Sequence, residues 1–249
     1  MEQSRTQESP YRALSAGQVE AFRRQGFVVP GIGLEAAEVE SLGREYDRVF
    51  DEARGSERFR NLSGEDADEE MLQITQVCER SLDFRRLLYH PRILDAVEDL
   101  IGPNIQLFHD QALYKPAHHG GPIHWHQDNA YWQCLPADLV SCWLTFDDVD
   151  AENGAMHLVP GSHMAPVEHE RGDVLLDAGG DSAGSAFVAD LPAGSLMFHH
   201  CQTLHHTRPN RTSRRRRAFA VHFMRPGTRS AHAGEMPISF SRPLLRCRI

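Results

Sequence analysis

The feature that most constrains the fold of this chain is a change in its pattern after Pro103. Before this point apolar residues recur at helical spacing, whereas after it short apolar segments alternate with turn residues such as Gly, Pro and Asn. Short strands at such intervals indicate a β sandwich or a β barrel. Helices followed by strands predict an α+β protein in which the helices brace a β core. The predicted strands cover residues 105–114, 123–132, 139–146, 155–159, 187–191, 195–200 and 218–224.

The N-terminal part predicts the supporting helices. Ser15 followed by Gln18 forms a capping-box pattern before an amphipathic segment, and Gly26 stands where that helix should stop. Apolar residues at helical spacing predict further helices over 34–54 and over 81–101, the latter interrupted by a proline.

A chain of 249 residues is long enough to bury one substantial core, so we expect a single domain. Residues 55–72 are charged and polar and predict an exposed loop. The expected parts are a flexible arm over 1–13, mainly helical support over 14–102, a β core over 103–225 and a tail over 226–249.

Composition excludes several classes of protein. The net charge of −9 argues against nucleic acid or an anionic membrane as the main partner. No apolar run approaches the ~20 residues that span a bilayer, and residues 1–13 lack the apolar region of a secretory signal. The five cysteines are odd in number and widely spaced, which argues against a disulfide framework. Reduced thiols in a cytoplasmic protein, monomeric or homodimeric, are the simplest interpretation.

A possible metal motif lies in the predicted strand over 123–132. In an extended strand His126 and Asp128 project from one face, while Gln127 turns away. An imidazole beside a carboxylate supplies two of the three ligands in the 2-His-1-carboxylate triad that suits non-haem Fe(II). A lone His-x-Asp is more often an ordinary surface strand or turn, so the hypothesis needs a further ligand.

Candidates for the third ligand lie near the other end of the β region. A histidine in an apolar strand is more often simply packed and hydrogen-bonded than bound to a metal, and spacing alone does not choose among them. The candidates are His199, His200, His205, His206 and His222.

Several motifs together resemble one family. Their order and spacing are similar to those of the phytanoyl-CoA dioxygenase family of Fe(II)/2-oxoglutarate oxygenases, from about residue 105 to 225, and the helix and strand at 15–29 also resemble it. The matching features are the His-Gln-Asp at 126–128, the Asn-Gly at 153–154, the Pro-Gly-Ser-His at 160–163, the Gly-Ser at 194–195 with Phe198, and then His205 and Arg216.

The resemblance implies a double-stranded β-helix, or jelly roll, with Fe(II) held between its sheets by His126, Asp128 and His205. Two of the remaining coordination positions would take 2-oxoglutarate and one would take O2. The implied reaction hydroxylates an unactivated C–H of a small molecule and yields succinate and CO2. Related halogenases lack the carboxylate ligand, so the presence of Asp128 favours hydroxylation.

Two departures from the family pattern bear on the distal histidine, and one of them is the bend at 207–210, which has Arg208 and Pro209 where small residues are common. The family usually has a small residue after the distal histidine, where this chain has His206, so His206 is the alternative to His205. The resemblance implies that Arg216 binds the distal carboxylate of 2-oxoglutarate, because a guanidinium matches a carboxylate. Arg214 and Arg217 are the alternatives, and the run of arginines is otherwise a solvated charged segment.

Other residues around the implied site have both a functional and an ordinary interpretation. Thr207 is placed to add a hydrogen bond to the same carboxylate. Trp143 corresponds to an aromatic residue that lines the cofactor pocket in the family, or else it is simply core. Tyr131 and Trp132 flank the substrate mouth, or else they pack beside a turn.

The strand before the His-Gln-Asp presents Gln111, Leu113 and Lys115 on one face. The resemblance suggests that this face lines the 2-oxoglutarate and substrate cavity. Lys115 is equally well interpreted as an exposed charge at the end of the strand.

The sequence leaves the outcome of the oxidation and the substrate open. One alternative is desaturation, epoxidation or cyclisation with the same cofactors. The other is a metal-binding jelly roll without turnover, and the presence of both the triad and Arg216 argues against it. The acidic charge disfavours an acyl-CoA, and a specialised-metabolite or amino-acid-like substrate fits by analogy. Specificity should lie in 55–83, 164–186 and 227–249, and 164–186 is long enough to be a lid.

Overall fold

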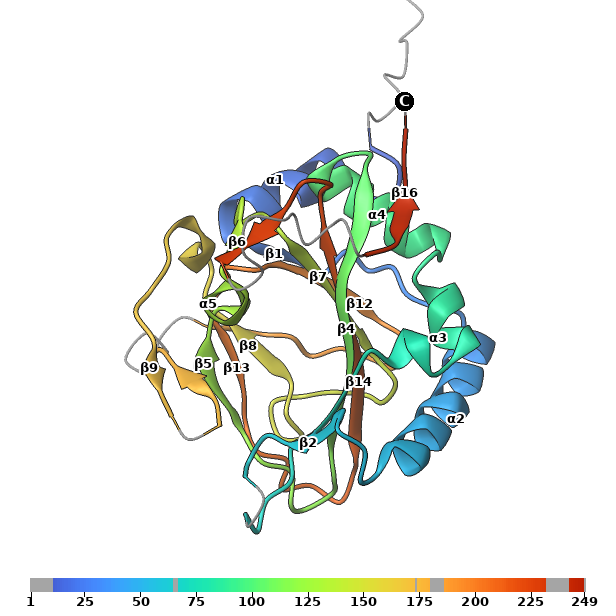
Figure 1. Ribbon diagram of the computed structural model, residues 1–249, viewed down its shortest axis with the longest axis vertical. Helices are drawn as coiled ribbons and strands as arrows, with labels where there is room; N and C mark the ends of the chain where they lie inside the picture. The colour runs from blue at the N-terminus through green and yellow to red at the C-terminus, as the bar shows by residue number, and fades with distance from the viewer. Residues whose placement is uncertain (1–10, 65–66, 173, 180–185, 232–241, 249) are drawn as a thin grey trace, which may run out of the picture.

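Two antiparallel sheets form the centre of the protein (Figure 1). The computed structural model describes residues 11–64, 67–172, 174–179, 186–231 and 242–248. The large sheet contains β1 (Phe27–Val28), β12 (Leu196–His200), β7 (Val140–Thr145), β14 (Arg216–Met224), β4 (Ile105–Lys115), β3 (Leu72–Thr75) and β2 (Phe59–Asn61) in that order, with β16 (Leu244–Arg246) paired to β4. The small sheet contains β11 (Phe187–Val188), β8 (Met156–Leu158), β13 (His205–Thr207) and β5 (Ile123–His126).

Two short pairs of strands and the helices complete the fold. The pairs are β9 (Glu170–Arg171) with β10 (Leu176–Asp177), and β6 (Cys134–Leu135) with β15 (Arg229–Ser230). The helices are α1 (Ala16–Gln25), α2 (Ala36–Ala53), α3 (Leu82–Leu87), α4 (Pro91–Ile101) and α5 (Asp128–Trp132), with 3-10 turns η1 (Val77–Glu79) and η2 (Ser162–Met164). No helix within the described ranges is long and apolar enough to cross a membrane.

The alternation of side chains along the central strands decides which face of the large sheet is covered. On β14, Phe219, Val221 and Phe223 join the main core with the helices, and Phe219 packs 4.7 Å from Phe84 of α3 between ring centroids. Burying one such side chain contributes about 1.5–3 kcal/mol. Figure 1 shows α2, α3 and α4 along this side of the sheet. The opposite face therefore looks toward the small sheet, as in a jelly roll, and the predicted α+β fold is confirmed.

The helix ends follow the predicted local chemistry. Ser15 accepts a hydrogen bond from the amide of Gln18 and forms the reciprocal capping box, and Gly26 adopts a left-handed conformation with φ of 86°. The amide of Gly26 donates to the carbonyl of Phe22, which closes the helix. Pro91 opens α4 at a position where a helix needs no amide hydrogen, so the interruption predicted there divides α3 from α4.

Two predicted segments were wrong. The strand predicted over 123–132 ends at His126, because α5 begins at Asp128. The stretch 55–72 includes β2, which pairs with β3 and has half-exposed side chains, so its polar composition concealed a strand. The stretch 164–186, predicted as a lid, includes β9 and β10. The structure does not describe residues 1–10 of the predicted arm, 173 and 180–185 of the predicted lid, or 232–241 of the predicted tail.

Candidate active site

A cavity of about 340 Å³ lies between the two sheets. Its lining comes from β3, β4, β7, β12 and β14 of the large sheet and from β5, β8 and β13 of the small sheet. Val174 and Leu175, beside β10, also line it. The cavity therefore collects side chains from segments that are far apart in the sequence.

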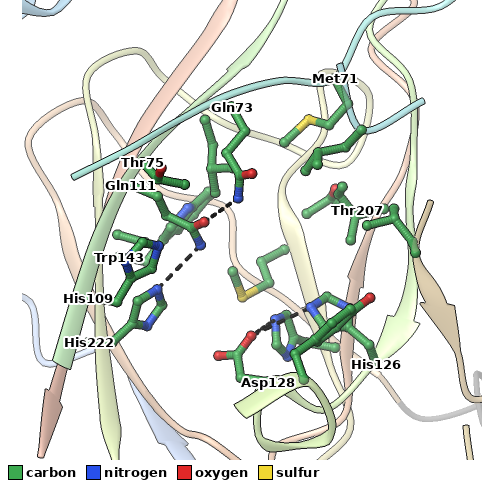
Figure 2. Close-up of a pocket in the computed structure, with 18 of the residues that line it drawn as sticks. Met71, Gln73, Thr75, His109, Gln111, His126, Asp128, Trp143, Thr207 and His222 are labelled. Atoms are coloured by element: carbon green, nitrogen blue, oxygen red, sulfur yellow. Dashed lines mark hydrogen bonds and ion pairs between the residues drawn. The ribbon is translucent and has the colours of Figure 1, made fainter. Parts of the chain in front are cut away.

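Three potential metal ligands meet in this cavity. His126 ends β5, Asp128 begins α5, and His205 begins β13, which pairs with β5 so that His205 lies opposite His126. One ligand atom from each of the three lies within 4.8 Å of the others. The Oδ1 atom of Asp128 is 3.6 Å from Nε2 of His126 and 3.8 Å from Nε2 of His205. Figure 2 shows His126 and Asp128 converging at one end of the cavity. The set could hold one ion.

Backbone carbonyls orient both imidazoles. Nδ1 of His126 donates to the carbonyl of His124, and Nδ1 of His205 donates to the carbonyl of Thr203, each at 2.8 Å. With Nδ1 of each ring engaged by a carbonyl, the Nε2 atoms face Asp128. This is the arrangement by which outer hydrogen bonds fix a metal-binding histidine.

The other oxygen of Asp128 is held from the large sheet. Nε2 of His199 lies 3.2 Å from Oδ2, and the hydroxyl of Ser141 lies 3.4 Å from it. Burial would raise the pKa of Asp128, but His205, His126 and His199 hold that pKa well below its usual range. Burial, together with His126, lowers the pKa of His205 well below its usual range. The carboxylate is thus ionised and His205 neutral, which are the states that bind a metal.

Arg216 lies at another part of the cavity as a buried cation. It is 1% exposed, and within the described ranges no carboxylate forms an ion pair with it. One of its terminal nitrogens donates to the carbonyl of Leu113 at 3.4 Å, while Nε has no hydrogen-bond partner. Burial lowers its pKa to about 10, so the guanidinium remains charged at neutral pH. An unpaired buried charge is costly, which points to an anionic ligand.

Two further side chains of the cavity lining have unsatisfied polar atoms. Thr207 Oγ1 and Trp143 Nε1 are buried, line the cavity and have no hydrogen-bond partner among the groups that the structure describes. The guanidinium carbon of Arg216 lies 5.9 Å from the centre of the Trp143 ring. These donors together fit a carboxylate better than a neutral or cationic group.

The two arginines considered as alternatives to Arg216 lie outside the cavity. Arg214 is exposed and forms an ion pair with Asp150, and Arg217 pairs with Asp147 and Asp47 under α2. Of the three arginines weighed, only Arg216 lines the cavity.

His206 also points away from the triad, because alternate side chains of a strand face opposite sides. Its ring packs against Trp125 and His157, with centroids 4.0 Å and 4.7 Å away. The register of β13 thus brings His205, and not His206, to His126.

Both interpretations of Lys115 from the sequence were wrong. Gln111 and Leu113 line the cavity, but Lys115 does not. It is 0% exposed, and its Nζ donates to the carbonyls of Gly121 at 2.5 Å and Arg208 at 2.7 Å. Lys115 is therefore neither a residue of the cavity wall nor an exposed charge. It joins the end of β4 to two loops.

Sequence reasoning missed part of the cavity wall. Gln73 and Thr75 line the cavity from β3, and His109 lines it from β4. His109 lies two residues before Gln111 on β4, so the alternation of side chains that placed Gln111 on the inner face also predicts His109 there. Gln73 and Thr75 were missed because the strand β3 was not predicted. Tyr131 and Trp132 line the cavity as expected.

Comparison with known proteins decides the family. Residues 22–218 match the family model described as phytanoyl-CoA dioxygenase (PhyH). The chain belongs to the phytanoyl-CoA dioxygenase family. This confirms the resemblance inferred from the motifs, and Fe(II), 2-oxoglutarate and O2 are the cofactors and cosubstrates of this family. The neutral histidine, the ionised carboxylate and the unpaired Arg216 fit that iron and that dicarboxylate.

Individual members show how far the similarity extends. A probable alpha-ketoglutarate-dependent hypophosphite dioxygenase of Stutzerimonas stutzeri is 30% identical over 54% of this chain and 50% of its own length. The ectoine dioxygenase of Halomonas elongata is 28% identical over 79% of this chain and 66% of its own length. The chain thus spans between half and two thirds of these two relatives.

Among solved structures of this fold, the epimerase SnoN in complex with Fe3+, alpha ketoglutarate and nogalamycin RO superposes with a TM-score of 0.76. It is 26% identical, and the match covers 92% of this chain and 98% of SnoN.

Proposed function

We propose that this protein is an Fe(II)/2-oxoglutarate-dependent dioxygenase that hydroxylates an unactivated C–H of a small molecule. The cosubstrates 2-oxoglutarate and O2 would become succinate and CO2. The observation that carries the proposal is the pairing, in one cavity, of a compact His-Asp-His cluster with a buried arginine that has no carboxylate partner among the described residues. A metal-binding jelly roll without turnover would have no need for that arginine.

In this proposal His126, Asp128 and His205 hold the iron. Bound iron and 2-oxoglutarate supply the oxidising power for attack on the C–H bond. Arg216 binds the distal carboxylate of 2-oxoglutarate, Thr207 donates a hydrogen bond to it, and the Trp143 indole lies alongside. The surrounding sheets exclude bulk water, which strengthens these charged contacts.

A second candidate is another reaction with the same cofactors: desaturation, epoxidation or cyclisation of the substrate, or its epimerisation. The similarity to the epimerase SnoN supports this second candidate. The outcome would depend on where the substrate lies relative to the iron, because the ligands for the metal are the same. The cytoplasmic location and the monomeric or dimeric state stay predictions from the sequence.

The test is an anaerobic spectrum of metal-free protein to which Fe(II) and 2-oxoglutarate are added. Chelation of the keto acid should give a visible charge-transfer band. We expect His126→Ala to abolish the band and Arg216→Ala to weaken it strongly. Arg214→Ala, two residues away but on the surface, is the matched control and should leave the band unchanged. Iron binding without the band would contradict the proposed activity.

A further inference from the structure

One wall of the cavity consists of uncharged polar side chains. They lie on the inner faces of three adjacent strands, since Thr75 of β3 is opposite Gln111 of β4, and His109 of β4 is opposite His222 of β14. Gln73 lies two residues before Thr75 on the same face of β3. We call these five residues the polar wall. Figure 2 shows all five on one side of the cavity, with Met71 and Thr207 across from them.

A directed chain of hydrogen bonds fixes the groups of the polar wall. The Asp128 carboxylate can only accept, so the Ser141 hydroxyl donates to it at 3.4 Å and accepts from Nδ1 of His222 at 2.7 Å. Nε2 of His222 must then accept, and it takes a hydrogen from the amide of Gln111 at 3.3 Å. The Gln111 carbonyl oxygen in turn accepts from the amide of Gln73. Both amides and the imidazole therefore have defined orientations.

Gln73, at the end of this series of hydrogen bonds, is available to bind a ligand. Gln73 uses one N–H in its bond to Gln111, and no other side chain of the described residues bonds to its amide. Its second N–H and its carbonyl oxygen can thus donate to and accept from a molecule in the cavity. Trp132 adds an apolar face beside the wall, with its ring 4.7 Å from that of His222.

The polar wall is uncharged at neutral pH. Burial lowers the pKa of His222 to about 3 and that of His109 to about 4, so neither imidazole is protonated there. Of the lining side chains, Asp128, Arg216 and Arg60 carry fixed charges. The first two are assigned to the metal and to 2-oxoglutarate, and Arg60 lies opposite Gln73 on β2, at the outer end of the wall, where its side chain is exposed to solvent. A substrate charge placed against the inner part of the wall, at Gln111, His109 and His222, would lose its hydration, and these three side chains offer it no counterion.

We propose that the polar wall and Trp132 form the substrate subsite beside the metal, and that this subsite takes an uncharged polar group, such as an amide, a ketone or a hydroxyl, on a molecule with an apolar or aromatic face. This inference rests on the proposed function for the location of the iron. It sets the protein apart from relatives named for hypophosphite, which is an anion, and for ectoine, which is zwitterionic.

The test compares three probes that share one ring: benzamide, benzoate and benzylamine. Each is titrated into the anaerobic Fe(II)–2-oxoglutarate protein, with 2-oxoglutarate saturating so that Arg216 is occupied, and the shift of the charge-transfer band is followed. We expect benzamide to bind at least about tenfold more tightly than either charged probe. Benzoate or benzylamine binding as tightly as benzamide would overturn the proposal, as would failure of benzamide to bind at ~10 mM, where a fragment of its size should.

Charge variants make the test specific to the wall. Gln73→Glu should weaken benzamide and strengthen benzylamine about tenfold, because it adds a carboxylate to the subsite. Gln25→Glu makes the same change on α1, outside the cavity lining, and should alter none of the three affinities. Unchanged probe preference in Gln73→Glu would overturn the proposal.

The two proposals fail in different ways. If the charge-transfer band never forms, the proposed activity fails, and the subsite is then tested by the shift of the thermal unfolding midpoint of metal-free protein with each probe. If the band forms but the probes show no preference for benzamide, the activity stands and the uncharged subsite does not.

Discussion

At the scale of single residues, the two oxygens of Asp128 have separate roles. Oδ1 faces the Nε2 atoms of His126 and His205, while Oδ2 is held by His199 and Ser141. A carboxylate held through one oxygen presents the other in a fixed direction, which lowers the entropy lost when a metal binds. His199, a candidate third ligand by sequence, is thus placed to position a ligand.

Loss of this support should weaken metal binding. We expect His199→Ala to reduce Fe(II) affinity by about 10- to 100-fold, the usual effect of removing an outer partner of a metal ligand. His119→Ala, which removes an exposed histidine, is the control and should not change the affinity. Anaerobic titration with Fe(II) measures both, and equal affinities in the two variants would contradict the role given to His199.

At the scale of elements, the junction of β5 and α5 depends on Gln127. Its side-chain amide donates to the carbonyls of Ser162, Ala165 and Gln202, and its carbonyl oxygen accepts from the amide of Val167 at 2.9 Å. Gln127 therefore turns away from the cavity, as the extended-strand interpretation predicted, and joins two segments, residues 162–167 and the turn at Gln202, to the segment that carries the ligands.

Removing this junction should destabilise the fold. We expect Gln127→Leu to lower the free energy of unfolding by about 2–4 kcal/mol, because buried carbonyls would lose their donor. Urea unfolding of metal-free protein measures the change, and Gln25→Leu at the half-buried end of α1 is the control. A difference below ~1 kcal/mol between the two variants would show that the carbonyls find other partners.

A second element, the β9–β10 pair, is attached to α5 by Tyr131. The Tyr131 hydroxyl accepts from the amide of Leu176 at 2.7 Å, and the neighbouring Leu175 lines the cavity. Tyr131→Phe should therefore speed hydrogen exchange at the Leu176 amide, since that amide loses its acceptor. Tyr89→Phe, at an exposed tyrosine, should leave this exchange unchanged. The same rate in all three proteins would rule out the attachment.

At the scale of the whole molecule, the two faces of the large sheet are used differently. The outer face packs against α2, α3 and α4 in a continuous apolar core, and the inner face carries polar groups around the cavity. The inner face includes buried neutral histidines, whose protonation would be costly. The stability of the fold is therefore linked to pH.

The sign of this linkage follows from His222. Its folded pKa of about 3 lies below the unfolded value of ~6.5, so its contribution is present above pH 6.5 and is lost as the pH falls toward 3. Between pH 7 and pH 5 the loss from this residue should be about 2 kcal/mol. Urea unfolding of metal-free protein at both values measures it, and His222→Phe should show a smaller dependence. Equal slopes in the variant and the parent would contradict the assignment.

What the sequence determined by itself is local. Period-two alternation identified β4, β7, β12 and β14, capping residues located the ends of α1, and a short motif located His126 and Asp128. Each of these signals depends on neighbours within a few residues, because strand and helix geometry fix which nearby side chains share a face. Even the family could be inferred from the order of such motifs.

The tertiary structure decided which distant segments meet. The pairing of β13 with β5 chose His205 over His206, since a shift of one residue turns a side chain to the other face. Arg214 forms an ion pair with Asp150, and Arg217 forms ion pairs with Asp147 and with α2. Of these arginines, only Arg216 therefore lines the cavity. Lys115 was misjudged because its partners are backbone carbonyls of loops, which no side-chain pattern records. The site is therefore a product of strand register, which local sequence does not fix.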